Sequence, residues 1–204
     1  MHVAILSESG ADEAALRILG DLVLGVRTTP VERLPLRSRG WPAVRNVLPV
    51  VIRYLQFRTN ADGLIVVVDS DHTSLQSSAE KNRLRNLDHL IQQTLSDLSE
   101  VRGRAKLRVA FGIAAPALEA WLLCRTVPEI SEQAWERGLI EKRDPYTKIE
   151  LKRRLYRVEF PSFELSKAKM TEAAAQCDIN HLNTQFPSGF GHLSQQLRNW
   201  RSLS

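Results

Sequence analysis

A short aliphatic run that ends in two aspartates constrains this chain more than any other stretch. Residues 64–74 read LIVVVDSDHTS, so five consecutive apolar residues lead directly to Asp69 and Asp71. An apolar run of this length, rich in valine, is typical of a strand buried on both faces, and such strands belong to parallel sheets covered by helices. The two aspartates would then lie at the carboxyl end of the strand, where open α/β sheets bind their ligands.

Asp69 and Asp71 are candidates for a divalent-metal site. Two carboxylates separated by one residue repel each other unless a cation lies between them, and hard oxygen ligands favour Mg²⁺ or Mn²⁺ over zinc. The alternative is a polar turn between strand and loop, because an Asp-x-Asp pattern is frequent by chance. The pattern alone leaves both interpretations open.

The composition is that of a globular protein with a mild basic excess. Of the 204 residues, 43% are hydrophobic and 25% are charged, and no apolar run is long enough for a membrane helix. The apolar start, Val3–Leu6, is broken at once by Ser7 and Glu8, so we predict no signal peptide and expect a cytoplasmic protein without membrane contact. The two cysteines lack metal-type spacing. The net charge of +5 permits a polyanionic partner without requiring one.

Predicted strands and helices alternate over the first 125 residues. Strands are predicted at residues 2–6, 31–36, 64–68 and 107–113, and helices at residues 12–25, 42–58, 78–101 and 117–124. A Ser77-x-x-Glu80 capping box opens the third of these helices. Beyond Thr126 the alternation stops, and helices are predicted after Pro145 and at residues 166–177 and 191–200. We therefore expect an α/β core at 1–125 and a helical extension at 126–204 that completes the same globular unit.

Two glutamates are candidates for the same edge of the sheet as the aspartates. Glu8 follows the first strand, and in a doubly wound sheet the end of that strand commonly lies beside the strand that carries Asp69. A solvated loop glutamate is the alternative. Glu119 stands in the first turn of a helix among apolar neighbours such as Trp121. It is either a surface residue favoured by the helix dipole or a third acidic group at the end of the sheet.

The segment at residues 141–157 is strongly basic. A helix of this kind can follow a phosphate backbone, although a solvated face is the commoner outcome. Lys148, Lys152 and Arg153 are the candidates for nucleic-acid binding.

The combination of a glutamate after the first strand and Asp-x-Asp after the third resembles the Toprim fold. This is the Rossmann-like catalytic domain of topoisomerases, primases and the overcoming-lysogenization-defect type nucleases. The chain is more closely similar to small stand-alone Toprim-like proteins of bacteria, the DUF4276 family. The matching stretches are residues 8–13 (ESGADE), 69–71 (DSD), 116–122 (PALEAWL) and, loosely, 186–190 (FPSGF). The extra residue at Ser9 departs from the usual Glu-Gly pair of that family.

The resemblance implies a mostly parallel Toprim sheet with helices on both faces, and magnesium-dependent phosphodiester chemistry. Glu8, Asp69 and Asp71 would hold Mg²⁺ or Mn²⁺, and Glu13 and Glu119 would complete a second site. Two such metals can stabilise the attacking and the leaving oxygens of an in-line displacement.

The resemblance also implies a lysine that neutralises charge at the phosphate. Lys167 is our first choice for it and Lys148 the second. The expected activity is that of a nuclease, so nucleic acid is the expected substrate. An ATPase is an expected partner, notably in anti-phage defence, and a homo-oligomer is compatible with this hypothesis.

Two other functions compete with the nuclease. Residues 69–73 also fit the hhhhDxDxT motif of haloacid-dehalogenase-like phosphatases, in which Asp69 would be the nucleophile and Asp71 the acid/base. That motif normally lies on the first strand, its later acidic motif is not visible here, and it leaves Glu8 and Glu119 without a role. The other hypothesis is a non-catalytic module that binds nucleic acid or a partner subunit.

Overall fold

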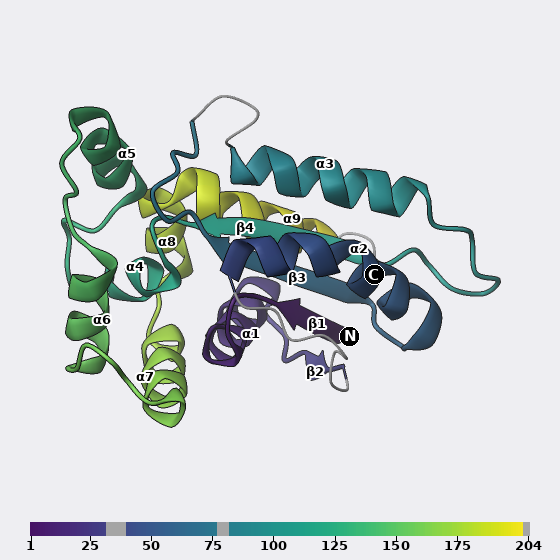
Figure 1. Cartoon of the computed structure of the whole chain (residues 1–204). Coiled ribbons are helices and arrows are strands. Elements are labelled where there is room, and N and C mark those ends of the chain that lie inside the picture. The colour runs from purple at the N-terminus through teal and green to yellow at the C-terminus, as the bar shows by residue number, and fades with distance from the viewer. Residues whose placement is uncertain (32–39, 77–81, 202–204) are drawn as a thin grey trace.

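The structure, a computed structural model, describes residues 1–31, 40–76 and 82–201 (Figure 1). Within these residues, four parallel strands form one sheet in the order β2-β1-β3-β4. The strands are β1 (His2–Leu6), β2 (Thr29–Pro30), β3 (Gly63–Asp69) and β4 (Arg108–Ala114). The predicted Rossmann-like α/β fold with a mostly parallel sheet is confirmed. The strand predicted at 31–36 falls almost entirely outside the described residues, and the two-residue β2 lies just before it.

The aliphatic run at residues 64–68 forms the buried centre of the sheet, as its composition predicts. β3 pairs with β1 on one side and with β4 on the other, and each of its five aliphatic side chains is buried. Leu6 is the register partner of Val66, and Asp69 that of Ala114. This register brings the carboxyl ends of β1 and β3 to the same edge of the sheet.

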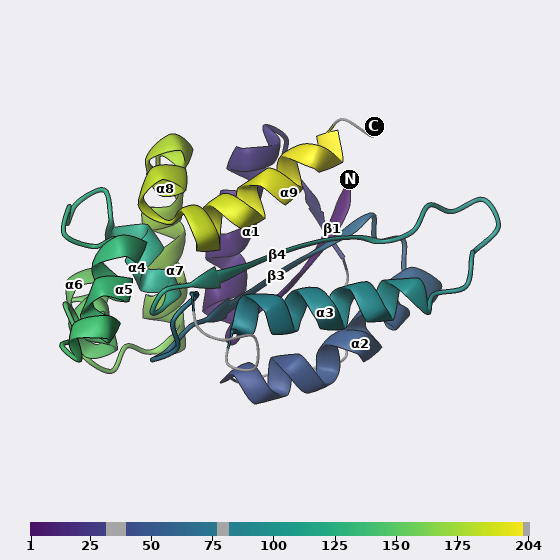
Figure 2. The same cartoon turned by 90° about the horizontal axis from the view of Figure 1, so that it is seen from above.

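Helices cover both faces of the sheet (Figure 2). On one face lie α1 (Gly10–Leu24) and α9 (His192–Arg201), and on the other lie α2 (Gly40–Arg58) and α3 (Arg83–Ser96). The contact with β3 is close on the first face. A Cβ added at Gly20 of α1 would lie 2.8 Å from Ile65 Cδ1, and one added at Gly63 would lie 2.6 Å from the Trp200 ring.

The other helices gather at the carboxyl ends of the strands (Figure 1). They are α4 (Leu118–Leu123), α5 (Glu132–Glu141), α6 (Lys148–Tyr156), α7 (Phe163–Ala175) and α8 (Ile179–Gln185), followed by the π-helical turn η1 (Pro187–Gly191). The extension shares one hydrophobic core with the sheet, because Leu193 and Leu197 of α9 are buried in the same cluster as Phe111 of β4.

Three details differ from the sequence prediction. The helices α5 and α8 lie in segments for which we predicted no helix. α3 is shorter than residues 78–101, and Asn82 caps it by accepting a hydrogen bond from Arg85 N at 3.1 Å. The predicted capping box of Ser77 and Glu80 lies outside the described residues. No helix in the described ranges has the length and apolar character needed to cross a membrane.

Candidate active site

Glu8 and Asp69 meet where β1 and β3 leave the sheet. The Asp69 backbone N–H donates a hydrogen bond to Glu8 Oε1 at 3.0 Å. Glu8 is therefore not a solvated loop residue, and the predicted neighbourhood of the two strand ends is observed. Burial raises the pKa of Glu8 above its ordinary value, although the hydrogen bond from Asp69 opposes this shift.

The Asp69 carboxylate is partly buried, with 22% of its side chain exposed, and is bonded at both oxygens. Oδ1 accepts a hydrogen bond from Leu118 N at the start of α4, at 3.1 Å, and Oδ2 lies 2.7 Å from Lys148 Nζ. Burial raises the pKa of Asp69 well above its ordinary value, and the charges of Glu119 and Glu8 act in the same direction against Lys148. The negative charges of Glu8, Asp69 and Glu119 therefore repel one another in a poorly solvated site.

Asp71 is held in an unusual backbone conformation. Its φ of 52° lies in the left-handed region, which favours glycine but which aspartate also visits. Its carboxylate accepts hydrogen bonds from Lys148 Nζ and, at 2.9 Å, from Arg83 Nη1. Burial alone would raise the pKa of Asp71, but the two cations outweigh it and hold the pKa below its ordinary value. Backbone strain of this kind is often found at functional sites.

Lys148, not Lys167, is the lysine at the aspartates. Lys148 is the first residue of α6, where Thr147 and Glu150 form a capping box, and its ammonium bridges both carboxylates. Burial would lower the pKa of Lys148, but the aspartates raise it overall, so the ammonium keeps its charge. Lys167 is exposed on α7 and forms no ion pair with any residue in the described ranges. The second choice made from the sequence therefore replaces the first.

Arg83 is a site residue that we did not predict from the sequence. It is the first residue of α3, and besides Asp71 it bonds the Asp69 carbonyl oxygen. The guanidinium also stacks over the ring of Trp41, 5.6 Å from its centroid. No local motif marks Arg83, because its position depends on where the chain returns after residue 76.

Glu119 belongs to the acidic group and not to the surface. Its side chain is 7% exposed, and Oε1 accepts a hydrogen bond from the Tyr156 hydroxyl at 3.0 Å. Of the two interpretations left open by the sequence, the structure supports the third acidic group at the end of the sheet. The pKa of Tyr156 is raised by burial and by Glu119, so its hydroxyl remains a donor.

Asp12 replaces Glu13 in the acidic group. Burial raises the pKa of Asp12 to about 7, with contributions from the charges of Glu119 and Glu8. Glu13, which we predicted as a metal ligand, acts instead on Arg17. Glu13 was implied by the family resemblance alone. α1 starts at Gly10, two residues earlier than predicted, and Ser9 Oγ accepts a hydrogen bond from Asp12 N at 3.2 Å. The spacing Ser9-x-x-Asp12 is a capping pattern that could have revealed this start.

The donor chemistry of this site suits a hard divalent cation. Its acidic groups are Glu8, Asp12, Asp69, Asp71 and Glu119. Among the described residues, only Lys148 and Arg83 bring positive charge to them, so negative charge is in excess. Carboxylate oxygens are the ligands that Mg²⁺ and Mn²⁺ prefer. Within the same residues, no three acidic, histidine or cysteine side chains are already grouped to hold a metal, and an ammonium stands between the aspartates.

A small pocket opens beside the aspartates. It has a volume of about 200 Å³, and its walls include Asp71, Lys148, His72 and Trp135. The loop on its rim is fixed by the buried Glu136 of α5, which accepts hydrogen bonds from the Ser74 hydroxyl and from Leu75 N at 2.6 Å. The unpredicted helix α5 therefore shapes the approach to the site.

The three nucleic-acid candidates differ in their surroundings. Lys148, Lys152 and Tyr156 are spaced by four residues and so share one face of α6. Because Lys148 and Tyr156 both bond carboxylates of the site, Lys152 lies between them on the face directed to it. Arg153 is exposed and pairs with Glu159.

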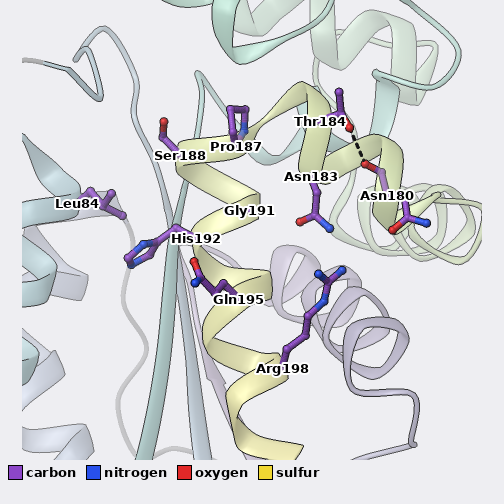
Figure 3. Close-up of a pocket in the computed structure, with 10 residues that line it drawn as sticks. All are labelled: Leu84, Asn180, Asn183, Thr184, Pro187, Ser188, Gly191, His192, Gln195 and Arg198. Carbon is purple, nitrogen blue, oxygen red and sulfur yellow. Dashed lines mark hydrogen bonds between the residues drawn. The ribbon is translucent and has the colours of Figure 1, made fainter.

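A larger hollow of about 820 Å³ lies elsewhere, between α3, α8 and α9 (Figure 3). Asn183 of α8 and His192, Gln195 and Arg198 of α9 line it, with Leu84 on the opposite side. Burial lowers the pKa of His192. None of the residues predicted for the site lines this hollow.

Comparisons of the chain with protein-family models, with curated proteins and with solved structures gave no match. The resemblance to Toprim proteins therefore rests on the motifs of the sequence, and family and function remain predictions.

Proposed function

We propose that this protein is a metal-dependent nuclease that hydrolyses phosphodiester bonds at the carboxylates where β1 and β3 end. The hydrogen bond between Asp69 N and Glu8 Oε1 is the observation that carries the proposal. It joins the glutamate after the first strand to the Asp-x-Asp of the central strand, which is the pairing that the resemblance requires. Neither element alone would distinguish this site from a polar turn.

Glu8, Asp69 and Asp71 are the residues that would hold Mg²⁺ or Mn²⁺. The metal, when bound, supplies positive charge for the attacking and the leaving oxygens of the phosphodiester. Asp69 is fixed by the amide of Leu118, and Glu8 by the amide of Asp69. These two carboxylates are thus oriented by backbone groups before any ligand arrives, which favours efficient catalysis.

Lys148 and Arg83 would bind the phosphate. An ammonium binds carboxylate and phosphate oxygens alike as a point charge, so Lys148 can exchange an aspartate for a phosphate oxygen. The guanidinium of Arg83 is oriented by Trp41 and by the Asp69 carbonyl. The pocket beside Asp71 and Lys148 offers space for a group attached to that phosphate.

The phosphatase hypothesis fits these contacts less well. It gives no role to Glu8 or Glu119, both of which approach Asp69 closely enough to raise its pKa. An ATPase partner remains part of the proposal, on the resemblance alone.

Cleavage of labelled single- and double-stranded DNA and RNA in Mg²⁺ or Mn²⁺ tests the proposal. We expect cleavage that chelator abolishes and that falls by about two orders of magnitude or more in Asp69→Asn and Glu8→Gln. Glu13→Gln is the matched control and should cleave like the unaltered protein. Turnover of a phosphomonoester that survives Glu8→Gln, with no cleavage of any nucleic acid, would overturn the nuclease in favour of the phosphatase.

A further inference from the structure

Two phenylalanine side chains are exposed to solvent where α6 connects to α7. The side chain of Phe160 is 87% exposed and that of Phe163 is 55% exposed, and Val158 beside them is also exposed. Burying a phenylalanine stabilises a fold by about 2 kcal/mol, so the fold gains little from rings left in this position. Exposed apolar side chains gathered on one short segment are candidates for a binding surface.

The two ends of this connection lie near the candidate active site. At its start, the Tyr156 hydroxyl bonds Glu119. At its end, the Phe163 ring lies 3.4 Å from where a Cβ on Gly10 would be, and Gly10 is two residues after Glu8. Figure 1 shows α6 and α7 at the end of the molecule where the strands end, and α1 packs against α7.

The surface next to the two rings is basic. Residues 148–164 contain five basic and three acidic side chains, a net positive charge that favours an anionic ligand over an apolar one. Arg153, Arg154 and Arg157 are exposed, and Lys152 extends the positive charge toward the aspartates. Cationic side chains that follow a backbone, interleaved with exposed aromatic rings, are the composition of sites for single-stranded nucleic acids.

We propose that Phe160 and Phe163 form a stacking platform for unpaired bases, so that the substrate of this site is a single-stranded nucleic acid. That the bound strand is a substrate rests on the proposed nuclease function, whereas binding of the strand to the two rings does not require cleavage. Bases in a duplex are stacked on one another and present no free face to these rings. The arginines of α6 would contact the phosphates of the same strand, which leads it toward Lys148 and the carboxylates.

Binding without turnover tests the platform. The probe is a fluorescein-labelled oligothymidylate of about 20 nucleotides, compared with a duplex of the same length by fluorescence anisotropy in chelator. We expect Phe160→Ala to weaken single-strand binding by about tenfold or more and to leave duplex binding unchanged. Phe160→Trp should bind as the unaltered protein does, because it keeps the aromatic face.

Two further variants make the result specific. Phe57→Ala is the matched control, since Phe57 is 45% exposed near the end of α2 that leads into β3, away from the carboxyl ends of the strands. Phe160→Leu keeps an apolar group without an aromatic face, so it should lose single-strand binding as Phe160→Ala does.

Full binding by Phe160→Leu or Phe160→Ala would overturn the proposal and assign the rings to a protein or membrane contact. Cleavage that persists in Phe160→Ala with unchanged single-strand affinity would refute the platform and leave the nuclease standing. Single-strand binding that depends on Phe160, without cleavage of any nucleic acid, would support the platform and refute the nuclease.

Discussion

Lys148 Nζ lies 2.7 Å from Asp69 Oδ2 and also bonds Asp71 Oδ1, so one cation from the helical extension spans both aspartates of the central strand. Nearly eighty residues separate the lysine from them along the chain. The extension therefore completes the candidate site and does not merely cover the sheet. Lys148 also stands where a divalent cation would have to compete for the same oxygens.

Lys148→Met should uncouple metal binding from activity. Without the ammonium, Asp69 and Asp71 repel each other, and we expect the metal-free protein to lose about 1 to 3 kcal/mol of unfolding free energy. Added Mn²⁺ should restore more stability to Lys148→Met than to the unaltered protein, because no ammonium competes, while nucleic-acid cleavage is lost. Thermal unfolding with and without Mn²⁺ measures this, with the exposed Lys167→Met as control. Equal stabilisation of both proteins by Mn²⁺ would show that the metal does not bind at these aspartates.

Arg104 should contribute strongly to the stability of the fold at the end of α2, a helix that covers one face of the sheet. Its guanidinium donates to the carbonyl oxygens of Leu55, Gln56, Thr59 and Ala61, and so binds the carboxyl end of α2 and the turn that follows it. Cations at this end of a helix are favoured by its dipole. We expect Arg104→Met to lower the unfolding free energy by about 2 to 4 kcal/mol. Urea denaturation measures the loss, and Arg102→Met, at an exposed position, should change it by less than about 0.5 kcal/mol.

The sequence predicted those parts of the site that depend on local pattern. The apolar runs define β1 and β3, and their shared edge places Glu8 beside Asp69 without any knowledge of the loops. Arg83 was not predicted and Lys148 was only the second choice for the lysine, because each reaches the aspartates through the path of a long connection. The resemblance to a family motif pointed to Glu13, and this chain departs from that motif by the extra residue at Ser9.

The two glycines of the turn η1 should differ in their tolerance of substitution: a change at Gly189 should destabilise the fold, and a change at Gly191 should not. A Cβ at Gly189 would lie 2.2 Å from the Ile113 carbonyl oxygen of β4, a backbone atom that cannot move without disturbing the sheet. We expect Gly189→Ala to destabilise the fold by about 3 kcal/mol or more. Gly191→Ala places its Cβ 3.6 Å from its nearest neighbour and should stay within about 1 kcal/mol of the unaltered protein. Similar losses for both variants would contradict the close contact of η1 with β4.

His192 should make the fold less stable in mild acid. Its ring lies against Phe111 at 4.8 Å, and burial lowers the pKa of His192 below 6.5, with Asp88 as the opposing charge. Below pH 6.5, the unfolded chain therefore binds a proton at this position more readily than the folded chain does. The stability that neutral His192 contributes is present above pH 6.5 and is lost as the pH falls through the lowered value.

Urea denaturation across this pH range tests the histidine. His192→Gln should flatten the decline in unfolding free energy below pH 6.5, whereas His89→Gln, at an exposed position of α3, should leave the curve unchanged. An identical decline in His192→Gln would assign the acid sensitivity to other groups.

Mn²⁺ binding, followed by the electron paramagnetic resonance signal of the free ion, tests the central claim most directly, because it needs neither substrate nor partner. We predict that the unaltered protein and Glu13→Gln remove Mn²⁺ from solution, and that Asp69→Asn and Glu8→Gln each weaken this binding by about tenfold or more. Mn²⁺ binding that is equal in all four proteins, or absent from all of them, would contradict a metal site at the ends of β1 and β3.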